Sequence, residues 1–466
     1  MSTDRQGEAS RSPLILCVLV GWLTSISLGA ASAVFATHGE VRDVLADLQP
    51  ILPAALRTSD DHAAATVWST WIASHDRETR DRLDRGDEDT IVNWLMFGTS
   101  FTTRPRAGEA APAQTADLMI GRADDLVAAL AAPGRDERRL FAKAFYEHRG
   151  YHVDNAVERA RLRDHVIEHV TQVGRELASY ASEVAAIRGV PDASEQFALR
   201  SRVFRDRGLS LDTSLPPCFA VERALAKMID DGLLRPGAVR DVAVIGPGLD
   251  FTDKSAGFDF YPQQTLQPFA LLDALARFRL GAAGATIHLT TLDISPRVND
   301  HVRRARMAAR TGSAYEVHLP LDRRIGWTAD VVRYWKQFGD QVGTEVPAAQ
   351  SSGAPEGVDV RTIRVRPSVA LQIVPEDLDI VAQRDPAESF DLVIATNVFV
   401  YYDTLDQSLA LKNIEAMVRP GGFLLSNNAL LELPSSRMRS VGYQTVQYSD
   451  RADDGDHIVF YQRRVP

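Results

Sequence analysis

Cysteine is scarce in this chain of 466 residues, which contains only Cys17 and Cys218. Cys17 lies in an apolar segment, where it would either meet lipid or be removed by cleavage. A disulfide framework in the mature chain is therefore excluded. The spacing of the two cysteines also excludes a cysteine-based zinc site, and we predict no metal site.

Positive charge is also in short supply. Lysine and arginine together number 52, against 62 aspartate and glutamate residues, and the formal net charge is -10. A nucleic-acid-binding surface needs a surplus of basic side chains on one face, so we expect no nucleic-acid partner. One local basic cluster is interpreted as the solvated face of a helix; it comprises Arg303, Arg304, Arg306 and Arg310.

The chain shows neither an internal repeat nor a low-complexity tract. Hydrophobic residues at 45% and charged residues at 24% are typical of an ordinary globular protein. A length of 466 residues exceeds one compact core of ordinary size. We therefore predict two domains, preceded by any targeting segment.

A long stretch without charge lies near the N-terminus. Arg5 and Arg11 precede the apolar residues 13–36, and the Ala-Ser-Ala sequence at 31–33 fits a cleavage signal. This pattern predicts a signal peptide over residues 1–36. An uncleaved membrane anchor is the alternative, because roughly 20 apolar residues span a bilayer. Both interpretations predict an exported or membrane-associated protein; a buried N-terminal helix is the third interpretation.

Residues 37–209 carry a helical pattern, with abundant Ala, Leu, Arg and Glu. In the segment from Ala156 to Ile187, apolar residues recur at spacings of three and four. We predict an α-helical domain here. The aromatic residues between Ile91 and Phe101 are interpreted as core, with a substrate-facing surface as the alternative.

The pattern changes in residues 210–466, where short apolar runs alternate with helical or irregular segments. Such runs are typical of buried parallel strands that helices cover on both faces. The sequence predicts an α/β fold, a doubly wound Rossmann-like sheet that ends in an antiparallel hairpin. The predicted strands cover residues 241–245, 286–292, 369–374, 390–395, 423–426, 445–448 and 457–462.

The first two of these strands end in residues suited to a nucleotide. The first strand runs into the turn Gly246-Pro-Gly248, where the backbone can approach a ligand closely. The second ends at Asp293, whose carboxylate can accept hydrogen bonds from both hydroxyls of a ribose. The alternatives are an ordinary turn for the glycines and a helix N-cap for Asp293.

Two further motifs stand in the C-terminal half. FDLVIATNVFVYYD occupies residues 390–403, and MVRPGGFLL occupies residues 417–425 after a predicted helix. With these motifs the chain resembles the class I S-adenosylmethionine-dependent methyltransferases, over roughly residues 218–466. In that family an F-D-x-V strand leads to the active-site loop, and Pro-Gly-Gly ends the helix before the fifth strand. Residues 397–402 are similar to the chemotaxis-receptor carboxyl methyltransferases in particular.

The resemblance implies that the domain binds S-adenosylmethionine and transfers its methyl group. The acceptor stays open among a small molecule, a lipid and a protein side chain. The resemblance further implies cofactor-binding roles: Gly246 and Gly248 at the methionine part, Asp293 at the ribose, Glu376 or Asp377 near the adenine amino group, and Asn397 and Val398 along the cleft.

Methyl transfer from a sulfonium is an in-line displacement, so the protein mainly aligns the reactants and excludes water. A catalytic base is therefore optional. Our candidates for one are Tyr401, Tyr402 and Asp403, which follow the fourth strand. Their alternative roles are packing for the tyrosines and a helix cap for Asp403.

The chain departs from the family at several positions. Val244 replaces a usual acidic residue, and Asp250 stands where a third glycine is common. An inserted aromatic loop at 250–268 lengthens the distance from Gly248 to Asp293. We expect this loop either to border the pocket or to pack as an aromatic plug against the helical domain.

A second insertion, at 319–357, contains Trp327, Tyr334 and Trp335. These aromatic residues could form a lid that stabilises a sulfonium by cation–π attraction. Packing is the alternative role for each of them.

Two rival functions share parts of this pattern. A nicotinamide-dependent oxidoreductase would use the same glycine turn and Asp293, but the third glycine is missing and the terminal hairpin is foreign to that fold. A non-catalytic, membrane-tethered relative would explain the departures at Val244 and Asp250. An exported methyltransferase would also lack a supply of S-adenosylmethionine, which is made inside cells.

Overall fold

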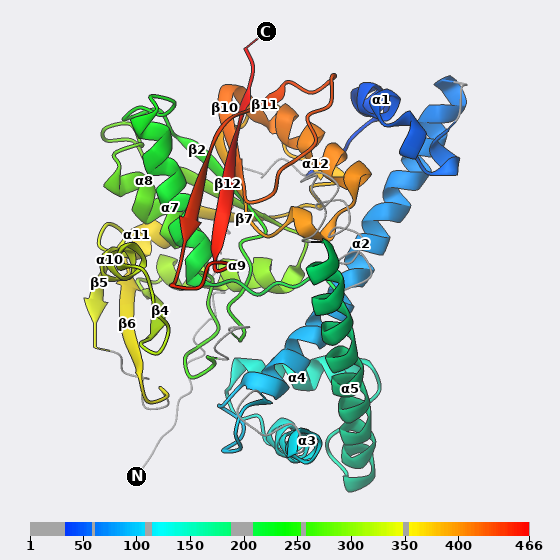
Figure 1. Cartoon of the computed structure of the whole chain (residues 1–466), viewed down its shortest axis with the longest axis vertical. Coiled ribbons are helices and arrows are strands. Elements are labelled where there is room, and N and C mark those ends of the chain that lie inside the picture. The colour runs from blue at the N-terminus through cyan, green and yellow to red at the C-terminus, as the bar shows by residue number, and fades with distance from the viewer. Residues whose placement is uncertain are drawn as a thin grey trace, which may run out of the picture. The chain divides into compact units, whose positions relative to one another are not determined.

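The computed structural model describes residues 33–57, 61–107, 114–187, 208–252, 258–347 and 354–465. From Ala33 onward the residues form one compact unit. At its centre lies a seven-stranded sheet with the order β11-β12-β10-β9-β2-β3-β7 (Figure 1). Its strands are β2 (Asp241–Ile245), β3 (His288–Asp293), β7 (Ile373–Asp377), β9 (Phe390–Ala395), β10 (Val418–Ser426), β11 (Met438–Gln447) and β12 (Gly455–Arg463).

The order of the strands reverses in the middle of this sheet. The five strands from β7 to β10 are parallel, and β12 and β11 close the far edge as an antiparallel pair. The chain builds β2, β3 and β7 toward one edge, then returns to place β9 beside β2. This arrangement confirms the predicted doubly wound sheet with its terminal hairpin. Open α/β sheets bind ligands where the order reverses, outside the carboxyl ends of the strands.

Both faces of the sheet are buried, which explains the continuous apolar runs. In β2, Val242 and Val244 belong to one hydrophobic core, whereas Ala243 and Ile245 belong to another. This division follows from the two-residue period of a strand. The first core is completed by α7 (Leu215–Asp230), α8 (Gln267–Arg277) and α9 (Pro296–Arg310), and the second by α12 (Thr404–Met417) and α1 (His38–Asp47).

The third parallel strand lies further along the chain than its predicted range of 369–374. Pro367–Ala370 forms the short helix α11, with Pro367 in its first turn. Proline suits the first turn of a helix because it lacks a backbone N–H. Strand β7 begins only at Ile373, so Glu376 and Asp377 belong to the strand itself.

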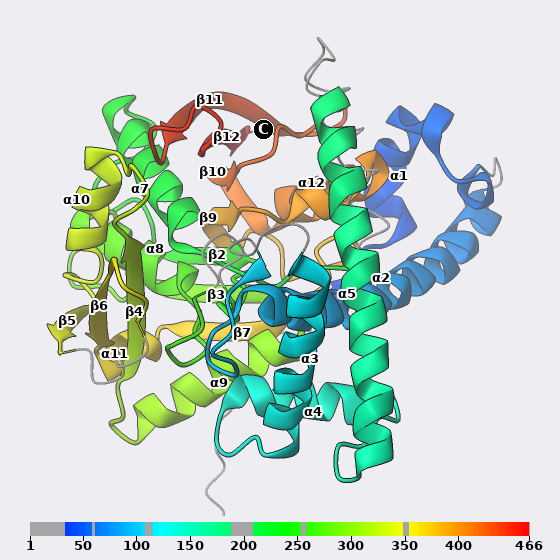
Figure 2. The ribbon, with the colours of Figure 1, turned by 60° about the horizontal axis from the view of Figure 1, so that its bottom comes forward.

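Helices dominate the N-terminal part of the described chain. Trp94 is fully buried, and its ring meets Phe101 edge to face at 4.9 Å between centroids, so the aromatic residues at 91–101 form core. Figures 1 and 2 show α3, α4 and α5 gathered around the C-terminal part of α2. These helices are α2 (Asp61–Phe97), α3 (Thr115–Ala131), α4 (Glu137–His148) and α5 (Ala156–Ile187).

The second insertion forms a small sheet of its own. Its strands pair antiparallel in the order β4-β6-β5. Tyr334 and Trp335 are buried beside it, and the Trp335 indole N–H donates to the Leu319 carbonyl at 2.9 Å. These two aromatic side chains therefore pack in the core. The insertion comprises β4 (Tyr315–Asp322), α10 (Ala329–Gln337), β5 (Gly343–Val346) and β6 (Val358–Val365).

The predicted signal peptide and membrane location need correction. Among the described residues, no helix has the length and apolar character needed to cross a bilayer. The end of the apolar stretch is instead a strand, β1 (Val34–Phe35), paired with β8 (Gln383–Arg384). The Trp68 indole N–H donates to the Ala36 carbonyl at 2.7 Å, which fixes this strand to α2. Residues 1–32 lie outside the described part of the chain.

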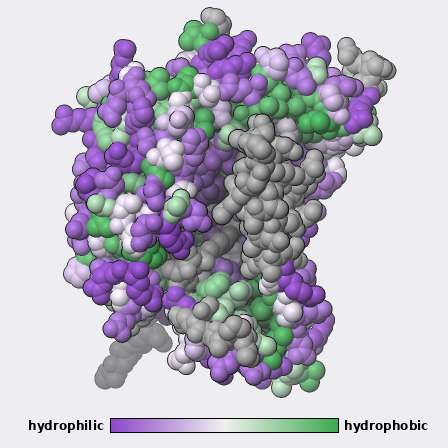
Figure 3. Space-filling view, viewed as in Figure 1, coloured by the Kyte–Doolittle hydropathy of each residue, from purple (hydrophilic) through white to green (hydrophobic). Residues whose placement is uncertain are grey.

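The surface seen in Figure 3 is mainly hydrophilic, with hydrophobic residues in small separate areas. Large hydrophobic side chains that are exposed come from distant elements, such as Val157 in α5, Met307 in α9 and Tyr443 in β11. Single exposed hydrophobic residues are usual on protein surfaces.

Candidate functional site

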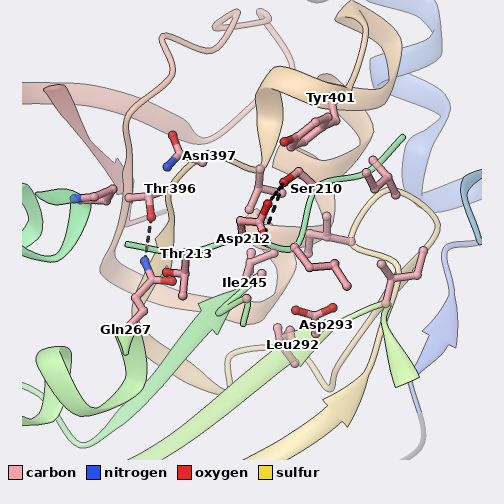
Figure 4. A pocket seen from close by; sticks show the side chains of 18 of the residues that line it. Ser210, Asp212, Thr213, Ile245, Gln267, Leu292, Asp293, Thr396, Asn397 and Tyr401 are labelled. Atoms are coloured by element: carbon pink, nitrogen blue, oxygen red, sulfur yellow. Dashed lines mark hydrogen bonds between the residues drawn. The ribbon is translucent and has the colours of Figure 1, made fainter. Parts of the chain in front are cut away.

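A cavity opens at the carboxyl ends of the parallel strands, where the strand order reverses (Figure 4). It encloses about 790 Å³ of space, counting its open mouth. Asp293, at the end of β3, faces the loop after β9 across this space. Residues 209–213, which precede α7, form a further wall. The cavity thus lies where an open α/β sheet binds its ligand.

The glycine turn after β2 forms the floor of the cavity. Gly246 and Gly248 have φ angles of +63° and +67°, a conformation that favours glycine. A Cβ atom on Gly248 would lie 2.5 Å from the carbonyl oxygen of Leu211. One on Gly246 would lie 2.9 Å from the Val398 side chain. Contacts within the protein therefore require both glycines.

Asp293 is a buried carboxyl group on the cavity wall, with only 4% of the residue exposed. One of its oxygens accepts a hydrogen bond from the Ser295 backbone N–H at 2.8 Å. Burial raises the pKa of Asp293 to about 7, against the lowering effect of the Ser295 and Gly248 backbone N–H groups. Nearby Asp377 adds to the rise and Arg297 opposes it. Asp293 therefore changes its charge near neutral pH.

Ser295, not Asp293, occupies the N-cap position of α9. The Asp293 carboxylate instead spans a two-residue turn back to the Ser295 N–H, and the Asn299 amide donates to the Asp293 carbonyl at 2.8 Å. These contacts fix the end of β3. The carboxyl group is thereby held rigidly at the cavity.

The two acidic residues predicted near adenine do not line the cavity. Asp377 forms an ion pair with Arg80 of α2 at 2.8 Å. Glu376 interacts with Asp385, and burial together with this second carboxyl group raises the pKa of Glu376 to about 8. The wall beyond β7 is formed instead by Leu378 and Ile380. The predicted strand range of 369–374 ends too early to place Leu378 and Ile380 at the cavity, because β7 extends to Asp377.

The loop after β9 brings Asn397 and Val398 to the cavity. Asn397 has a φ of +59°, which asparagine tolerates better than most residues. Its backbone N–H donates to the Asn427 side chain at 2.8 Å, and the Asn427 amide donates back to the Asn397 side chain at 2.7 Å. The end of β10 thus holds this uncommon backbone conformation in place. On the same wall, Gln267 donates to the Thr396 hydroxyl at 2.7 Å (Figure 4).

The three candidates for a base differ in position. Tyr401 is half-buried and lines the cavity. Tyr402 also lines it, but burial raises the pKa of Tyr402 well above 10, so its phenol stays protonated. Asp403 does not line the cavity; as N-cap of α12 it accepts a hydrogen bond from the Asp406 N–H at 2.9 Å.

Helix α2 contacts the segments that border the cavity, which no local pattern in the sequence predicted. Arg80 donates to the Ile294 carbonyl after β3 at 3.3 Å, and Arg82 donates to the Tyr401 carbonyl at 3.0 Å. A Cβ atom on Gly86 would lie within 1.9 Å of the Leu209 carbonyl oxygen. Gly86 interrupts a helical pattern, and this was the one available signal of a close contact.

A buried ion pair connects α2 with the site. Arg297 of α9 lies 3.0 Å from Asp87, and the two side chains are 15% and 17% exposed. Burial lowers the pKa of Arg297, and the charges of Asp87, Asp212 and Asp293 oppose this effect. The guanidinium also lies over the Phe141 ring at 4.1 Å. The helices therefore contribute charge to the surroundings of Asp293.

The 250–268 loop packs as a plug against the helices, one of the two predicted alternatives. Phe251 is fully buried and meets Trp94 edge to face at 5.7 Å. Arg138 of α4 donates to the carbonyls of Phe251 and Tyr261 at 2.5 and 2.6 Å. The Asp259 carboxylate accepts from the Trp94 indole at 2.7 Å. Residues 253–257 lie outside the described part.

No family model matches the chain. Over 184 residues, the chain is 28% identical to the hybrid PKS-NRPs synthetase opdA of Penicillium oxalicum. The matched segment is 39% of this chain and 4% of that protein. The chain therefore spans only a small part of this curated relative.

Solved structures give low-identity matches. The N-methyltransferase NodS of Bradyrhizobium japonicum is 15% identical with a TM-score of 0.27, covering 53% of this chain and 97% of that one. Magnesium protoporphyrin IX methyltransferase of Synechocystis is 13% identical with a TM-score of 0.24, covering 59% and 88%. An exported-protein candidate of Bordetella parapertussis is 14% identical with a TM-score of 0.27, covering 78% and 100%.

Scores at this level carry no argument about activity. The fold rests on the described strands: the reversal between β2 and β9, together with the antiparallel pair at the far edge. In these features the chain has a class I methyltransferase-like fold, as the sequence resemblance implied.

Proposed function

We propose that this protein is an S-adenosylmethionine-dependent methyltransferase whose cofactor site is the cavity between the β2, β3 and β9 strand ends. The observation that carries the proposal is the buried Asp293 carboxyl group, held at that cavity where the strand order reverses. A carboxylate in this position can accept hydrogen bonds from the two hydroxyls of a ribose.

The residues present fit this cofactor. Leu378 and Ile380 offer an apolar wall to a flat adenine ring beyond β7. At the other end, the glycine turn exposes backbone rather than side chains toward the space. The aromatic ring of Tyr401 and the Asp212 carboxyl group line the same cavity and suit a positively charged ligand.

When bound, S-adenosylmethionine supplies a methyl group already activated by a sulfonium. The protein's own task is then to bind, orient and exclude water. Asp293 holds the ribose, and Asn397 and Val398 shape the cleft. Arg80 and Arg82 of α2 support the cavity walls through the Ile294 and Tyr401 carbonyls. A protonated Tyr402 can donate a hydrogen bond but cannot accept a proton.

Isothermal titration calorimetry of the full chain tests the cofactor. We expect S-adenosylmethionine and S-adenosylhomocysteine to bind and NAD to show no heat of binding. The variant Asp293→Ala should weaken S-adenosylmethionine strongly, whereas Asp377→Ala, which removes a carboxylate outside the cavity, should not. Binding of NAD alone would indicate an oxidoreductase, and binding of neither ligand would indicate a non-catalytic relative.

Transfer itself is tested with S-adenosylmethionine labelled in its methyl group. The chain is incubated with a panel of phenols, amines, carboxylic acids and lipids, and labelled products are separated. We expect label in at least one acceptor class with the wild type and none with Asp293→Ala. Binding without transfer to any acceptor would contradict the enzymatic part of the proposal.

A further inference from the structure

A second cavity lies on the other side of the segment that leads into α7. It is bounded by the start of α7, the 250–268 loop, β4 and the turn before α10. It encloses about 750 Å³, counting its mouth. Among the described residues, the two cavities share none of their lining, but chain neighbours divide between them: Thr213 and Gln267 face the first cavity, Ser214 and Leu266 the second.

The walls of this second cavity are mostly apolar. Aliphatic and aromatic side chains come from α7, the 250–268 loop, β4 and α10, including Leu215, Phe219, Phe258, Leu266, Leu319 and Val331. An apolar cavity with a few polar groups is the usual form of a small-molecule site. Its walls suit a hydrocarbon ring.

Two polar side chains on the wall have unused hydrogen-bonding capacity: Tyr334 at its hydroxyl, and His318 at one ring nitrogen. His318 of β4 is only 5% exposed, and its Nδ1 lies 3.1 Å from the Thr362 hydroxyl. Among the described residues, its other nitrogen, Nε2, has no hydrogen-bond partner. Burial lowers the pKa of His318, so the ring is neutral at neutral pH. A ring nitrogen without a protein partner at a cavity wall can form a hydrogen bond with a ligand or with water.

The surroundings hold this imidazole in a fixed orientation. The Tyr261 ring stacks on it at 5.7 Å between centroids, with 17° between the planes. The Gln264 side chain binds the His318 backbone twice: its oxygen accepts from the His318 N–H at 2.7 Å, and its amide donates to the His318 carbonyl at 2.8 Å. Tyr261 in turn donates to Asp250 at 2.7 Å. Such rigid support is a property of binding sites.

We propose that this cavity, here called the His318 cavity, binds a small uncharged ring compound with one hydroxyl group, whose oxygen meets His318 Nε2. The hydroxyl suits either tautomer of the imidazole, because it can donate to Nε2 or accept from it. The apolar walls hold the ring. This inference rests on the second cavity alone and does not depend on the proposed methyl transfer.

Titration calorimetry of the full chain tests the inference with two probes of equal ring structure. 2-Naphthol carries the hydroxyl, and 2-methoxynaphthalene has it blocked. We expect 2-naphthol to bind roughly five- to tenfold more tightly, the usual effect of one hydrogen bond to a buried group. The variant His318→Phe should abolish this preference while still binding both probes.

Two variants separate the site from general effects. His301→Phe removes another buried histidine, which contacts Tyr315 and does not line the cavity, so the preference for 2-naphthol should survive. Ile325→Trp places a large side chain at the cavity and should abolish binding of both probes. Absence of 2-naphthol binding to the wild type would overturn the inference. Equal binding of 2-naphthol to wild type and Ile325→Trp would also overturn it, as adventitious surface binding.

Discussion

Strand β9 has two ends that differ in their chemistry. At its start, the Asp391 carboxylate accepts from the Arg240 and Asp241 backbone N–H groups at 2.8 and 3.0 Å, and it pairs with Arg419 at 2.6 Å. Just beyond its far end, Asn397 holds an uncommon backbone conformation at the cavity. The motif that supports the family resemblance therefore joins a residue that stabilises the fold to a residue that lines the proposed cofactor cavity. Similarity in such a motif is therefore stronger evidence for a shared fold than for a shared function.

The largest expected effect concerns Asp293, which lines the same cavity as Asn397 and so lies on the binding side of the sheet. Replacing it by alanine removes the acceptor for the ribose hydroxyls. We expect the dissociation constant of S-adenosylmethionine to rise about 100-fold, since hydrogen bonds to a charged group contribute about 1.5–3 kcal/mol each. Calorimetry measures this change. An unchanged affinity in a folded variant would contradict the assignment of the site.

Asp391→Ala should have the reverse profile. Two backbone N–H groups lose their acceptor, and we expect the free energy of unfolding to fall by about 2 kcal/mol in urea denaturation. The ion pair with Arg419 adds little, because that side chain is 38% exposed and screened by solvent. Affinity for S-adenosylmethionine should stay within twofold. A large loss of affinity at native-like stability would show that the two ends of β9 are not separate in function.

The pH dependence of cofactor binding distinguishes Asp293 from a carboxyl group outside the cavity. Because the pKa of Asp293 is about 7, most of its carboxyl groups are protonated at pH 6 and ionised at pH 8. Ribose hydroxyls favour the ionised form, so affinity should increase roughly tenfold from pH 6 to pH 8. Glu376→Gln, which removes a carboxyl outside the cavity with a pKa of about 8, should keep this dependence. Asp293→Asn should lose it.

The raised pKa of Asp293 predicts that the free energy of unfolding, unlike the affinity, decreases as the pH rises. A carboxyl group whose pKa rises on folding stabilises the fold while it is protonated, and this contribution is lost as the pH rises toward and through 7. The wild type should therefore lose stability between pH 4 and pH 8 relative to Asp293→Asn. Urea denaturation of both proteins across this range measures the difference. Parallel curves would contradict a raised pKa.

The smallest expected effect concerns the two cavities. Residues 213–214 and 266–267 form a wall between them, so a ligand on one side fixes part of the boundary of the other. We expect 2-naphthol to lower the dissociation constant of S-adenosylmethionine about fivefold. S-adenosylmethionine should lower the dissociation constant of 2-naphthol by the same factor. Titration of each ligand in the presence of the other tests this. Independent binding would mean that the wall is rigid in both states.

Local sequence patterns predicted much of the fold. The runs at 241–245 and 390–395 are strands at their predicted boundaries, because strands buried on both faces contain continuous apolar residues. The helix at 156–187 also begins and ends where its periodicity does. The glycine turn at 246–248 and the strand end at Asp293 were likewise predictable as parts of the cavity. Turns and strand ends are determined by residues that are close together in the chain.

Contacts between distant segments were not predictable in this way. No local pattern shows that Arg82 reaches the Tyr401 carbonyl, 319 positions further along the chain. The third strand was placed early because an apolar run followed Pro367, and this run is partly helix α11. The apolar stretch before residue 37 was interpreted as a membrane segment because its composition does not reveal that Val34 and Phe35 pair with β8.

The contacts of α2 with the segments that border the cavity have a practical consequence for dissecting this protein. Arg80 and Arg82 reach the ends of β3 and β9, and Gly86 presses against Leu209. A fragment that starts at residue 210 would contain every strand of the central sheet yet lose these contacts, together with Leu209 of the cavity wall. Ligand affinities of that fragment would describe a cavity whose bordering segments have lost part of their support, and not the cavity of the intact chain.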